Sequence, residues 1–363
     1  MQISIPTFLM RGGTSRGPFF LETDLPADAA SRDRVLLAVM GSPDRRQIDG
    51  LGGANPLTSK AGIVARSTQP GVDLEFLFAQ VSVDKALVDT TPNCGNMLAA
   101  VVPFALETGL VQAHGKASTY RVLTRNTGMQ CDITVQTPNR TICYDGDARI
   151  DGVPGASAPV LINFLDTAGS VCAGLLPTGR VLDTMDGLEV TCIDNGMPMV
   201  LVRAADLGRT GAETVDQLNA DTALKERVEA LRLQCGELMG MGDVSAKPYP
   251  KMCLVAAPRQ GGSIATRCFI PHVCHDAIGV LAAVTVGTAC VLPGTVAEGL
   301  ASVPDSVPKA LSVEHPSGEF SVSLEMDPAN PHNVLRAALL RTARALMKGE
   351  ALIPQSVWKG DKA

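Results

Sequence analysis

A cysteine lies directly before a long apolar run in the first half of the chain. The segment from Thr91 to Met97 reads Thr-Pro-Asn-Cys-Gly-Asn-Met, and the apolar run from Leu98 to Leu106 predicts a buried helix. Backbone amides at a helix start lack intrahelical partners and carry the positive end of the helix dipole, so they can hold a carboxylate and favour the thiolate of Cys94. The spacing therefore predicts one surface that binds an anion and moves a proton.

The surroundings of Cys94 differ from those of an ordinary buried cysteine. Around it, Pro92 and Gly95 predict a tight loop, and the helix begins at once. We expect the helix-start residues Gly95, Asn96 and Met97 to contact a substrate carboxylate. Free cysteine more often behaves as a small buried hydrophobe, and five others lie inside apolar or strand-like runs: Cys131, Cys143, Cys192, Cys253 and Cys290.

Composition narrows the class of protein. The chain has 363 residues, enough for two domains that each bury a core of their own. It is 45% hydrophobic and only 4% aromatic, and its net charge is −6. Because it has no run of Lys or Arg and few aromatic side chains to stack on bases, we expect no nucleic-acid partner.

No targeting or membrane segment is expected. Residues Met1 to Pro6 lack the basic segment and apolar stretch of a signal peptide, and the longest apolar run, Ile278 to Leu292, is too short and too interrupted to cross a bilayer. Ten cysteines without a C-x-x-C pair fit a reducing compartment. We therefore expect a cytoplasmic protein that does not bind membranes.

One cluster of potential metal ligands lies in the second half of the chain. Cys268, His272, Cys274 and His275 are close together in sequence. A zinc site would normally add a second pair of ligands at finger-like spacing, and this sequence has none. We therefore expect no bound metal.

The chain repeats one plan of predicted elements, and this repeat is the strongest clue to its architecture. Each half opens with two strands joined by a glycine turn, at 5–21 and at 188–202, where Asn195-Gly196 is a strong hairpin signal. A helix follows in each half, from Ala27 to Met40 and from Glu213 to Met239.

The repeat continues through the segments that could carry chemistry. Each half presents a lysine before a β-branched run, Lys60 in the first and Lys251 in the second. The loop of Cys94 precedes its apolar helix, as the loop of Cys274 precedes a helix from Ala277 to Cys290. We expect both helix starts to face the cleft between the two halves.

Two more strands joined by a glycine turn close each half, at 121–136 and at 311–326. The repeat therefore predicts two similar halves, each a curved sheet closing around an apolar helix. We place these domains at residues 1–183 and 184–363, and we expect a last helix that could pack back on the first domain.

Six short motifs lie along nearly the whole chain. Each is weak alone, but together they are specific: Met10-Arg11-Gly12-Gly13-Thr14-Ser15, Asp49-Gly50-Leu51-Gly52-Gly53, Thr58-Ser59-Lys60, Asn93-Cys94-Gly95-Asn96, His315-Pro316-Ser317-Gly318 and Arg341-Thr342-Ala343-Arg344-Ala345-Leu346-Met347. With these motifs the chain resembles the PrpF-type isomerases, a family with the diaminopimelate-epimerase-like fold.

The resemblance implies an α+β fold of two pseudo-symmetric domains, each a curved, mostly antiparallel sheet wrapped around a central helix. It also implies an active site at their interface and no cofactor. Family members move a proton within unsaturated di- and tricarboxylates, and the chain looks most similar to the 4-oxalomesaconate tautomerases and isomerases of gallate and protocatechuate breakdown. Methylaconitate cis–trans isomerases are near relatives. Keto–enol tautomerisation and a 1,3-allylic shift both stay open, as does the assembly, with a homodimer as one option.

The resemblance also implies that Lys60 and Cys94 carry the proton. Lys60 is expected to act as the general base, provided that burial and neighbouring positive charge lower the pKa of its amine; an ordinary lysine at a strand end would simply be exposed. Cys94 is expected to be the partner acid, or the base in the reverse direction, since a thiol has an ordinary pKa of about 8.5 that shifts readily.

Four further residues are expected to bind the substrate's carboxylates. Arg11 and Arg267 offer the two-pronged geometry of a guanidinium, although either could instead form a surface or structural ion pair. Thr14 and Ser15 could donate hydrogen bonds to a carboxylate, or bond only their own backbone.

His272 and His275 are expected to orient the substrate or polarise its carbonyl, or else to be satisfied by packing. An epimerase that uses two thiols, Cys94 and Cys274, is an alternative function. However, the epimerases of this fold carry a second catalytic cysteine before a glycine, and this chain has Cys274-His275-Asp276 there. A non-catalytic polycarboxylate-binding protein is the third alternative, and it would not exchange the carbon-bound hydrogens of its ligand with deuterated water.

Overall fold

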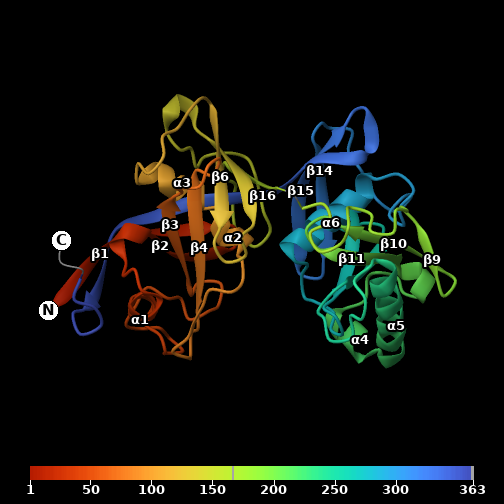
Figure 1. The fold of residues 1–363 in the computed structure, drawn as a ribbon, viewed down its shortest axis with the longest axis horizontal. Coiled ribbons are helices and arrows are strands. Elements are labelled where there is room, and N and C mark those ends of the chain that lie inside the picture. Colours follow the sequence, from red (N-terminus) through yellow and green to blue (C-terminus); the bar gives the residue numbers. More distant parts are fainter. Residues whose placement is uncertain (166, 361–363) are drawn as a thin grey trace. The chain divides into compact units, whose positions relative to one another are not determined.

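The computed structural model describes residues 1–165 and 167–360, and of Pro331 and His332 only the backbone. The chain forms two compact units (Figure 1). Unit 1 comprises Met1–Leu165 and Arg341–Ala363, and unit 2 comprises Asp166–Leu340. The division between residues 183 and 184 that the sequence repeat indicates stays a prediction.

The strands of unit 1 pair in the order β1, β2, β3, β4, β6, β7 and β8, and β5 pairs with the end of β4. Helix α1 lies on one face of this sheet, and α2 and α3 lie on the other. The bounds are β1 Gln2–Gly12, β2 Ser15–Leu21, η1 Glu22–Asp24, α1 Ala29–Met40, β3 Lys60–Arg66, β4 Leu74–Val81, β5 Val88–Asp89, α2 Gly95–Leu98, α3 Val101–Glu107, β6 Ala117–Thr124, β7 Gln130–Gln136, η2 Pro138–Arg140 and β8 Pro159–Phe164.

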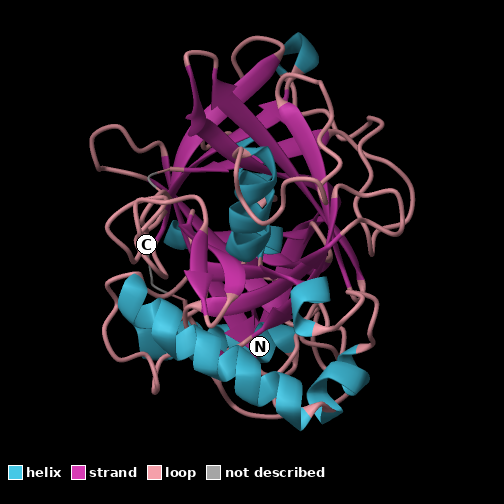
Figure 2. Ribbon diagram, turned by 90° about the vertical axis from the view of Figure 1, so that its right-hand side faces the viewer, coloured by secondary structure: helices cyan, strands magenta, loops and turns pink. Residues whose placement is uncertain are grey.

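The strands of unit 2 pair in the order β9, β10, β11, β12, β13, β14 and β15. Figure 2 shows strands around the central helix α6, with the long helix α5 along the outside. The bounds are β9 Asp183–Met185, β10 Leu188–Asp194, β11 Pro198–Arg203, η3 Ala204–Leu207, α4 Val215–Ala220, α5 Thr222–Leu238, β12 Lys251–Ala256, β13 Ile264–Phe269, α6 Val280–Val291, β14 Lys309–His315 and β15 Gly318–Asp327.

The two sheets share one pattern of strand pairing. From β1 to β7 the pairs are antiparallel, parallel, antiparallel, parallel and antiparallel. From β10 to β15 the same sequence of pairs recurs. Lys60 and Lys251 begin the equivalent strands β3 and β12. The predicted fold class, α+β with two pseudo-symmetric halves around central helices, is therefore confirmed.

Side chains alternate between the two faces of the unit 1 sheet. Ile63 of β3 and Leu77 of β4 point to the outer face, where they pack with α1. Phe19 of β2 and Phe76 of β4 stack on each other on the inner face, and Phe19 also contacts Phe104 of α3. The inner face therefore holds the central helix segments, and the outer face holds α1.

The central helix of unit 1 is shorter than the sequence predicts. In place of one helix from Leu98 to Leu106, α2 and α3 are separated by Ala99 and Ala100. Both of these amides bond to carbonyls three residues back, and Pro103 has no amide to donate to the Ala99 carbonyl. The helix after Cys94 is therefore a single turn with a small dipole. A ligand at its start would be held mainly by the amides that lack an intrahelical partner.

Two helices of unit 2 also differ from their predicted extents. The helix predicted from Glu213 to Met239 is divided into α4 and α5, because Asp221 ends the first and caps the second. The helix predicted from Ala277 to Cys290 begins only at Val280, six residues after Cys274. None of the described helices combines the length and apolar character that a bilayer span requires.

The C-terminal segment forms a strand where the sequence predicts a helix. β16 spans Asn330–Pro354. Its residues 330–339 pair with β15 in unit 2, and its residues 343–354 pair with β1 in unit 1. The Ala- and Leu-rich composition favours a helix locally, but pairing with β1, β8 and β15 overrides this propensity. The segment from Arg341 onward does belong to unit 1, as a strand.

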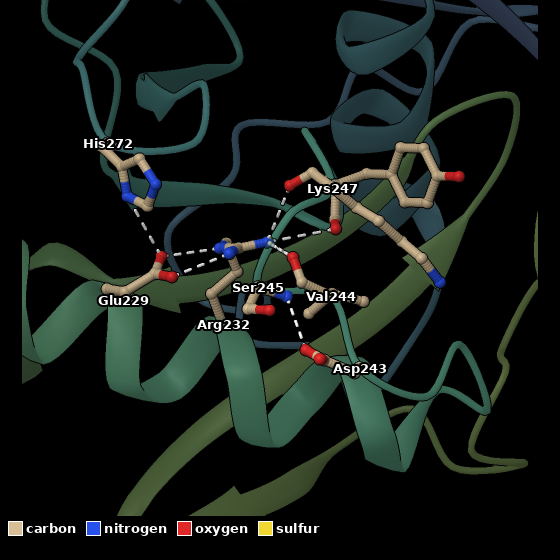
Figure 3. A network of polar contacts seen from close by, with 8 residues as sticks. Glu229, Arg232, Asp243, Val244, Ser245, Lys247 and His272 are labelled. Atoms are coloured by element: carbon tan, nitrogen blue, oxygen red, sulfur yellow. Dashed lines mark hydrogen bonds and ion pairs between the residues drawn. The ribbon is translucent and has the colours of Figure 1, made fainter.

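Helix α5 carries a fully buried arginine. Arg232 donates to both carboxylate oxygens of Glu229 at 2.7 and 2.8 Å (Figure 3). Its Nη1 donates to the carbonyls of Val244, Lys247 and Tyr249 at 3.0, 3.2 and 3.2 Å. The guanidinium therefore joins α5 to the loop that leads into β12.

Replacing Arg232 with Met should lower the free energy of unfolding by about 3 kcal/mol, because Glu229 and three carbonyls would each lose a buried donor. Urea denaturation of the full chain measures the change. Arg227→Met, on the exposed side of the same helix, should stay within about 0.5 kcal/mol of the parent. Equal effects of the two substitutions would contradict the structural role of Arg232.

Candidate active site

Two strands of unit 1 bring polar side chains to one edge of the inner face. β3 begins at Lys60, and β4, which is antiparallel to it, ends one residue after Gln80; the two residues are register partners. Because Ile63 and Leu77 face outward, alternation turns Lys60 and Gln80 inward. β2 begins at the same edge with Ser15.

Lys60 is buried, with 8% of its surface exposed, and its ammonium group is held by two contacts. Nζ donates to Oε1 of Gln80 at 2.7 Å and lies 5.0 Å from the centre of the Phe78 ring. The Gln80 amide donates in turn to the carbonyls of Ser59 and Pro56 at 2.9 and 3.1 Å, which fixes the direction of its oxygen. A carbonyl oxygen and a ring face both attract a cation, and an ammonium has further N–H groups to offer a ligand.

Cys94 is the N-cap residue of α2 and is half-buried. Its carbonyl accepts from the Leu98 amide at 2.9 Å, while its thiol makes no capping bond. The amides of Gly95, Asn96 and Met97 are those that a helix leaves without an intrahelical partner. The predicted position of Cys94 at a helix start is confirmed, and its role stays a prediction.

The turn between β1 and β2 is packed directly against α2. A Cβ on Gly12 would lie 2.3 Å from the Asn96 carbonyl oxygen, and a Cβ on Gly13, where φ is +50°, would lie 2.1 Å from Asn96 Oδ1. Asn96 Nδ2 donates to Thr14 Oγ1 at 3.0 Å. Glycine at both positions therefore permits the close approach that places Thr14 beside α2.

Two buried polar atoms beside this contact have no hydrogen-bond partner among the described residues. They are the hydroxyl oxygen of Ser15, a residue only 1% exposed, and Oδ1 of Asn96. Buried polar groups are nearly always hydrogen-bonded in folded proteins, so these two atoms have a bonding capacity that the described residues do not use. The hydroxyl can donate to a carboxylate, and the amide oxygen can accept from a hydroxyl.

Gly17 of β2 lies against both the backbone of Lys60 and the side chain of Met97 in α2. A Cβ on Gly17 would lie 1.8 Å from the carbonyl oxygen of Lys60 and 3.3 Å from the terminal methyl of Met97. The predicted residues Lys60, Met97 and Ser15 are therefore close together within unit 1 itself.

Arg11 bonds mainly to the protein's own backbone. Its Nη1 donates to the carbonyls of Gly13 and Thr342 at 3.0 and 3.1 Å, and to the Thr342 hydroxyl at 3.0 Å. Burial, and secondarily the charge of Arg344, lowers the pKa of the guanidinium. Arg11 therefore holds the glycine turn, and substrate binding by it stays a prediction.

Arg267 lies on β13 in unit 2 and is half-buried. It donates from Nε to the Glu213 carbonyl at 2.8 Å and from Nη1 to the Thr266 carbonyl at 2.9 Å. Burial is the largest influence on its guanidinium and lowers the pKa. These bonds anchor it to the segment before α4, and its predicted contact with substrate stays a prediction.

The two predicted histidines of unit 2 also have partners within that unit. His272 Nδ1 lies 3.4 Å from the Glu229 carboxylate and forms an ion pair with it when the ring is protonated (Figure 3). His275 Nδ1 accepts from the Ala277 amide at 2.8 Å. Both contacts order the loop before α6, and a role in orienting substrate stays a prediction.

Cys274 differs from Cys94 in its surroundings. It is only 2% exposed and belongs to the apolar core beneath α5. Burial raises the pKa of its thiol to about 11. Since α6 begins six residues later, Cys274 also lacks the helix-start amides that adjoin Cys94.

The potential metal ligands of the second half do not converge. Cys268 belongs to the core around α6, whereas Cys274 belongs to the core beneath α5 on the other side of the sheet. Across residues 1–165 and 167–360 no three or more His, Cys, Asp or Glu side chains are grouped closely enough to hold a metal ion.

Gln80 and Phe78, which contact the Lys60 ammonium, carry no signal as single residues. Their strand, Leu74–Val81, places Phe76, Phe78 and Gln80 on the inner face. A polar residue at an otherwise apolar inward position is the signal that could identify Gln80, and only the strand register shows that it faces Lys60.

Known proteins resemble the chain over nearly its whole length. It is 55% identical over 350 residues to a (4E)-oxalomesaconate Delta-isomerase of Novosphingobium sp. (strain KA1), covering 96% of this chain and 98% of that protein. It is 54% identical over 360 residues to a 4-oxalomesaconate tautomerase of Pseudomonas putida (strain KT2440), covering 99% of both. A crystal structure of methylitaconate Delta-isomerase matches with a TM-score of 0.86 at 35% identity, covering 99% of this chain and 98% of that one.

These similarities identify the chain as an isomerase with the fold of the methylitaconate enzyme. It belongs to the PrpF protein family, which matches residues 2–354.

Gly17→Ala should lower the free energy of unfolding by about 1–3 kcal/mol, because the new methyl group would displace the Lys60 carbonyl at the start of β3. Urea denaturation measures this change. Gly349→Ala is the matched control, since a Cβ at that strand position has no neighbour within 4 Å. If both variants are as stable as the parent, the close approach at Gly17 is not a constraint.

Proposed function

We propose that this isomerase moves a proton within 4-oxalomesaconate and that Lys60 and Cys94 carry it. Two relatives that are 55% and 54% identical to the chain are a (4E)-oxalomesaconate Delta-isomerase and a 4-oxalomesaconate tautomerase. The observation that carries the proposal is the edge of unit 1, where the backbone of the buried Lys60 and the Met97 side chain both lie against Gly17, near two polar atoms that have no partner among the described residues.

The proposed reaction needs two groups that exchange protons with one small ligand. The carbon between the keto group and the C=C bond is acidic, because loss of its proton gives an enolate conjugated with that bond. One carrier takes this proton. The other carrier then delivers a proton, either to the enolate oxygen, which gives the enol, or to the far carbon, which gives the shifted double bond. The amine of Lys60 and the thiol of Cys94 exchange the roles of acid and base between the two directions.

The polar groups of unit 1 suit a ligand with several carboxylates. In the proposed complex the Ser15 hydroxyl and the amides that follow Cys94 donate to a carboxylate. Asn96 Oδ1 accepts the hydroxyl of the enol form. In the direction in which Cys94 takes the proton, Lys60 is the ammonium that faces the negative charge on the enolate oxygen, and a cation there stabilises the transition state more than the ketone.

Ser15→Ala should raise KM by about tenfold or more, because a hydrogen bond to a charged group contributes about 1.5–3 kcal/mol. It should leave the stability of the free protein unchanged, since the hydroxyl has no hydrogen-bond partner among the residues that the structure describes. Steady-state kinetics and urea denaturation measure the two effects.

Ser59→Ala provides the contrasting control for stability. Ser59 Oγ donates to the Val81 carbonyl at 2.8 Å and accepts from Gln47 Nε2 at 2.7 Å, so its loss should destabilise the free protein by about 1 kcal/mol. A Ser15→Ala variant that is destabilised to the same extent, with an unchanged KM, would contradict the carboxylate-binding role.

A time course of 4-oxalomesaconate in deuterium oxide, followed by NMR, tests the reaction itself. The wild-type protein should convert the substrate and place deuterium in it. Lys60→Ala and Cys94→Ala should each reduce conversion by about 10²–10⁴-fold, since each removes one proton carrier. Label at the far carbon of the product indicates an allylic shift, whereas tautomerisation leaves that carbon unlabelled and labels only the carbon between the keto and alkene groups.

The matched control is Cys274→Ala, which should retain most of the activity because that thiol is buried in the core. If Cys274→Ala is inactive while Lys60→Ala is active, the two-thiol epimerase is the better description. Binding of the substrate without hydrogen exchange would support a non-catalytic binding protein. Faster conversion of a methylaconitate than of 4-oxalomesaconate would overturn the substrate assignment.

A further inference from the structure

We propose that Asn126, in the turn between β6 and β7, is the positioning residue that sets the place of Cys94 relative to Lys60. This inference rests on the proposed function, because it assumes that these two residues carry the proton. Asn126 is half-buried and belongs to a turn that the catalytic proposal does not otherwise use.

Asn126 fills a gap in the hydrogen bonding along β4. On one edge of β4, β6 pairs with residues 74–76 and then ends at Thr124, while β5 pairs only with Gln80 and Val81. Phe78 lies between these two pairings. The Asn126 side chain takes the place of a strand there: its Oδ1 accepts from the Phe78 amide at 2.9 Å, and its Nδ2 donates to the Phe78 carbonyl at 2.8 Å.

The same side chain also holds the loop that carries the thiol. Nδ2 of Asn126 donates to the carbonyl of Thr90 at 2.6 Å, directly after β5 and four residues before Cys94. The next residue of the turn continues this support, because the Thr127 hydroxyl accepts from Nδ2 of Asn93, which immediately precedes Cys94. The turn therefore contacts the Cys94 loop at both of its ends.

Asn126 is also linked to Lys60, through Phe78. The Phe78 ring lies 5.0 Å from Lys60 Nζ, and Gln80, two residues along the same strand, accepts from that ammonium. One amide side chain is thus bonded both to the strand beneath the ammonium and to the loop that bears the thiol. Its three hydrogen bonds fix the direction in which that loop leaves the sheet.

The separation of two proton carriers matters because both must reach the same small ligand. A misplacement of about 1 Å at a reacting group can reduce a rate by about 100-fold, even when its cause lies away from the chemistry. If Asn126 sets this separation, its loss should impair the second proton transfer more than the first. The intermediate would then return to substrate, carrying deuterium from the solvent.

The experiment compares wild type and Asn126→Asp with 4-oxalomesaconate in deuterium oxide. The Asp side chain has the same shape and can still accept from the Phe78 amide, but it cannot donate to the two carbonyls. We expect kcat to fall by about 10- to 100-fold with little change in KM. Deuterium recovered in unreacted substrate, per molecule of product formed, should increase severalfold.

Two further variants separate positioning from general stability. Arg125→Ala changes the neighbouring residue of the same turn and removes only surface ion pairs with Glu22 and Glu75, so its labelling ratio should match that of wild type. Thr127→Val removes the contact to Asn93, together with a 3.3 Å contact to the Thr124 hydroxyl within the same turn, and should raise the ratio by a smaller amount. It also provides the test if Asn126→Asp does not fold, which urea denaturation would reveal.

The outcomes distinguish this inference from the proposed function. Asn126→Asp and Thr127→Val variants whose labelling ratios equal that of wild type would overturn the positioning role alone, whether or not their activity falls with their stability. A wild-type protein that neither labels nor converts 4-oxalomesaconate would overturn the proposed function and this inference with it. A raised ratio in a folded variant, with wild-type labelling in Arg125→Ala, is the result we expect.

Discussion

The close approach of β2 to the start of β3 is the constraint on which the edge of unit 1 depends. At Gly17 there is no room for a side chain, because the Lys60 carbonyl occupies the place that a Cβ would take. Gly12 and Gly13 likewise have no Cβ that would clash with Asn96, so the turn between β1 and β2 can pack against α2. A hairpin without side chains at three positions thus allows a strand and a helix start, distant in sequence, to present their polar groups at one edge.

The repeat could be predicted from sequence because its signals are local. Paired runs of β-branched residues, glycine turns and an Asn195-Gly196 hairpin indicate the same elements in both halves, and the strand pairings confirm them. The strand β16 could not be predicted in this way, because its composition favours a helix and its pairing with β1, β8 and β15 makes it a strand. Gln80 and Asn126 are equally hidden, since their partners are set by strand register and by a turn far along the chain.

The two halves share a framework but differ in their chemical groups. Lys60 and Lys251 begin equivalent strands, so the framework places a lysine at the same point twice. The cysteines do not correspond in the same way: Cys94 directly precedes α2 and is half-buried, whereas Cys274 is buried in a core well before α6 begins. Strand pairing is tolerant of such differences because it uses the backbone, while the reactivity of a thiol depends on exposure and on neighbouring charge.

The polar groups at the edge of unit 1 also suit a site that stabilises charge on a ligand without reorienting its own side chains. A buried hydroxyl and a buried amide oxygen have no hydrogen-bond partner within the part of the chain that the structure describes, and the Lys60 Nζ contacts a neutral carbonyl oxygen and a ring face. Such groups are already desolvated and held by the fold, so they need no reorientation when charge develops on a ligand. In the proposed reaction that charge is largest on the enolate, and the fixed donors therefore lower the energy of the enolate more than that of the ketone.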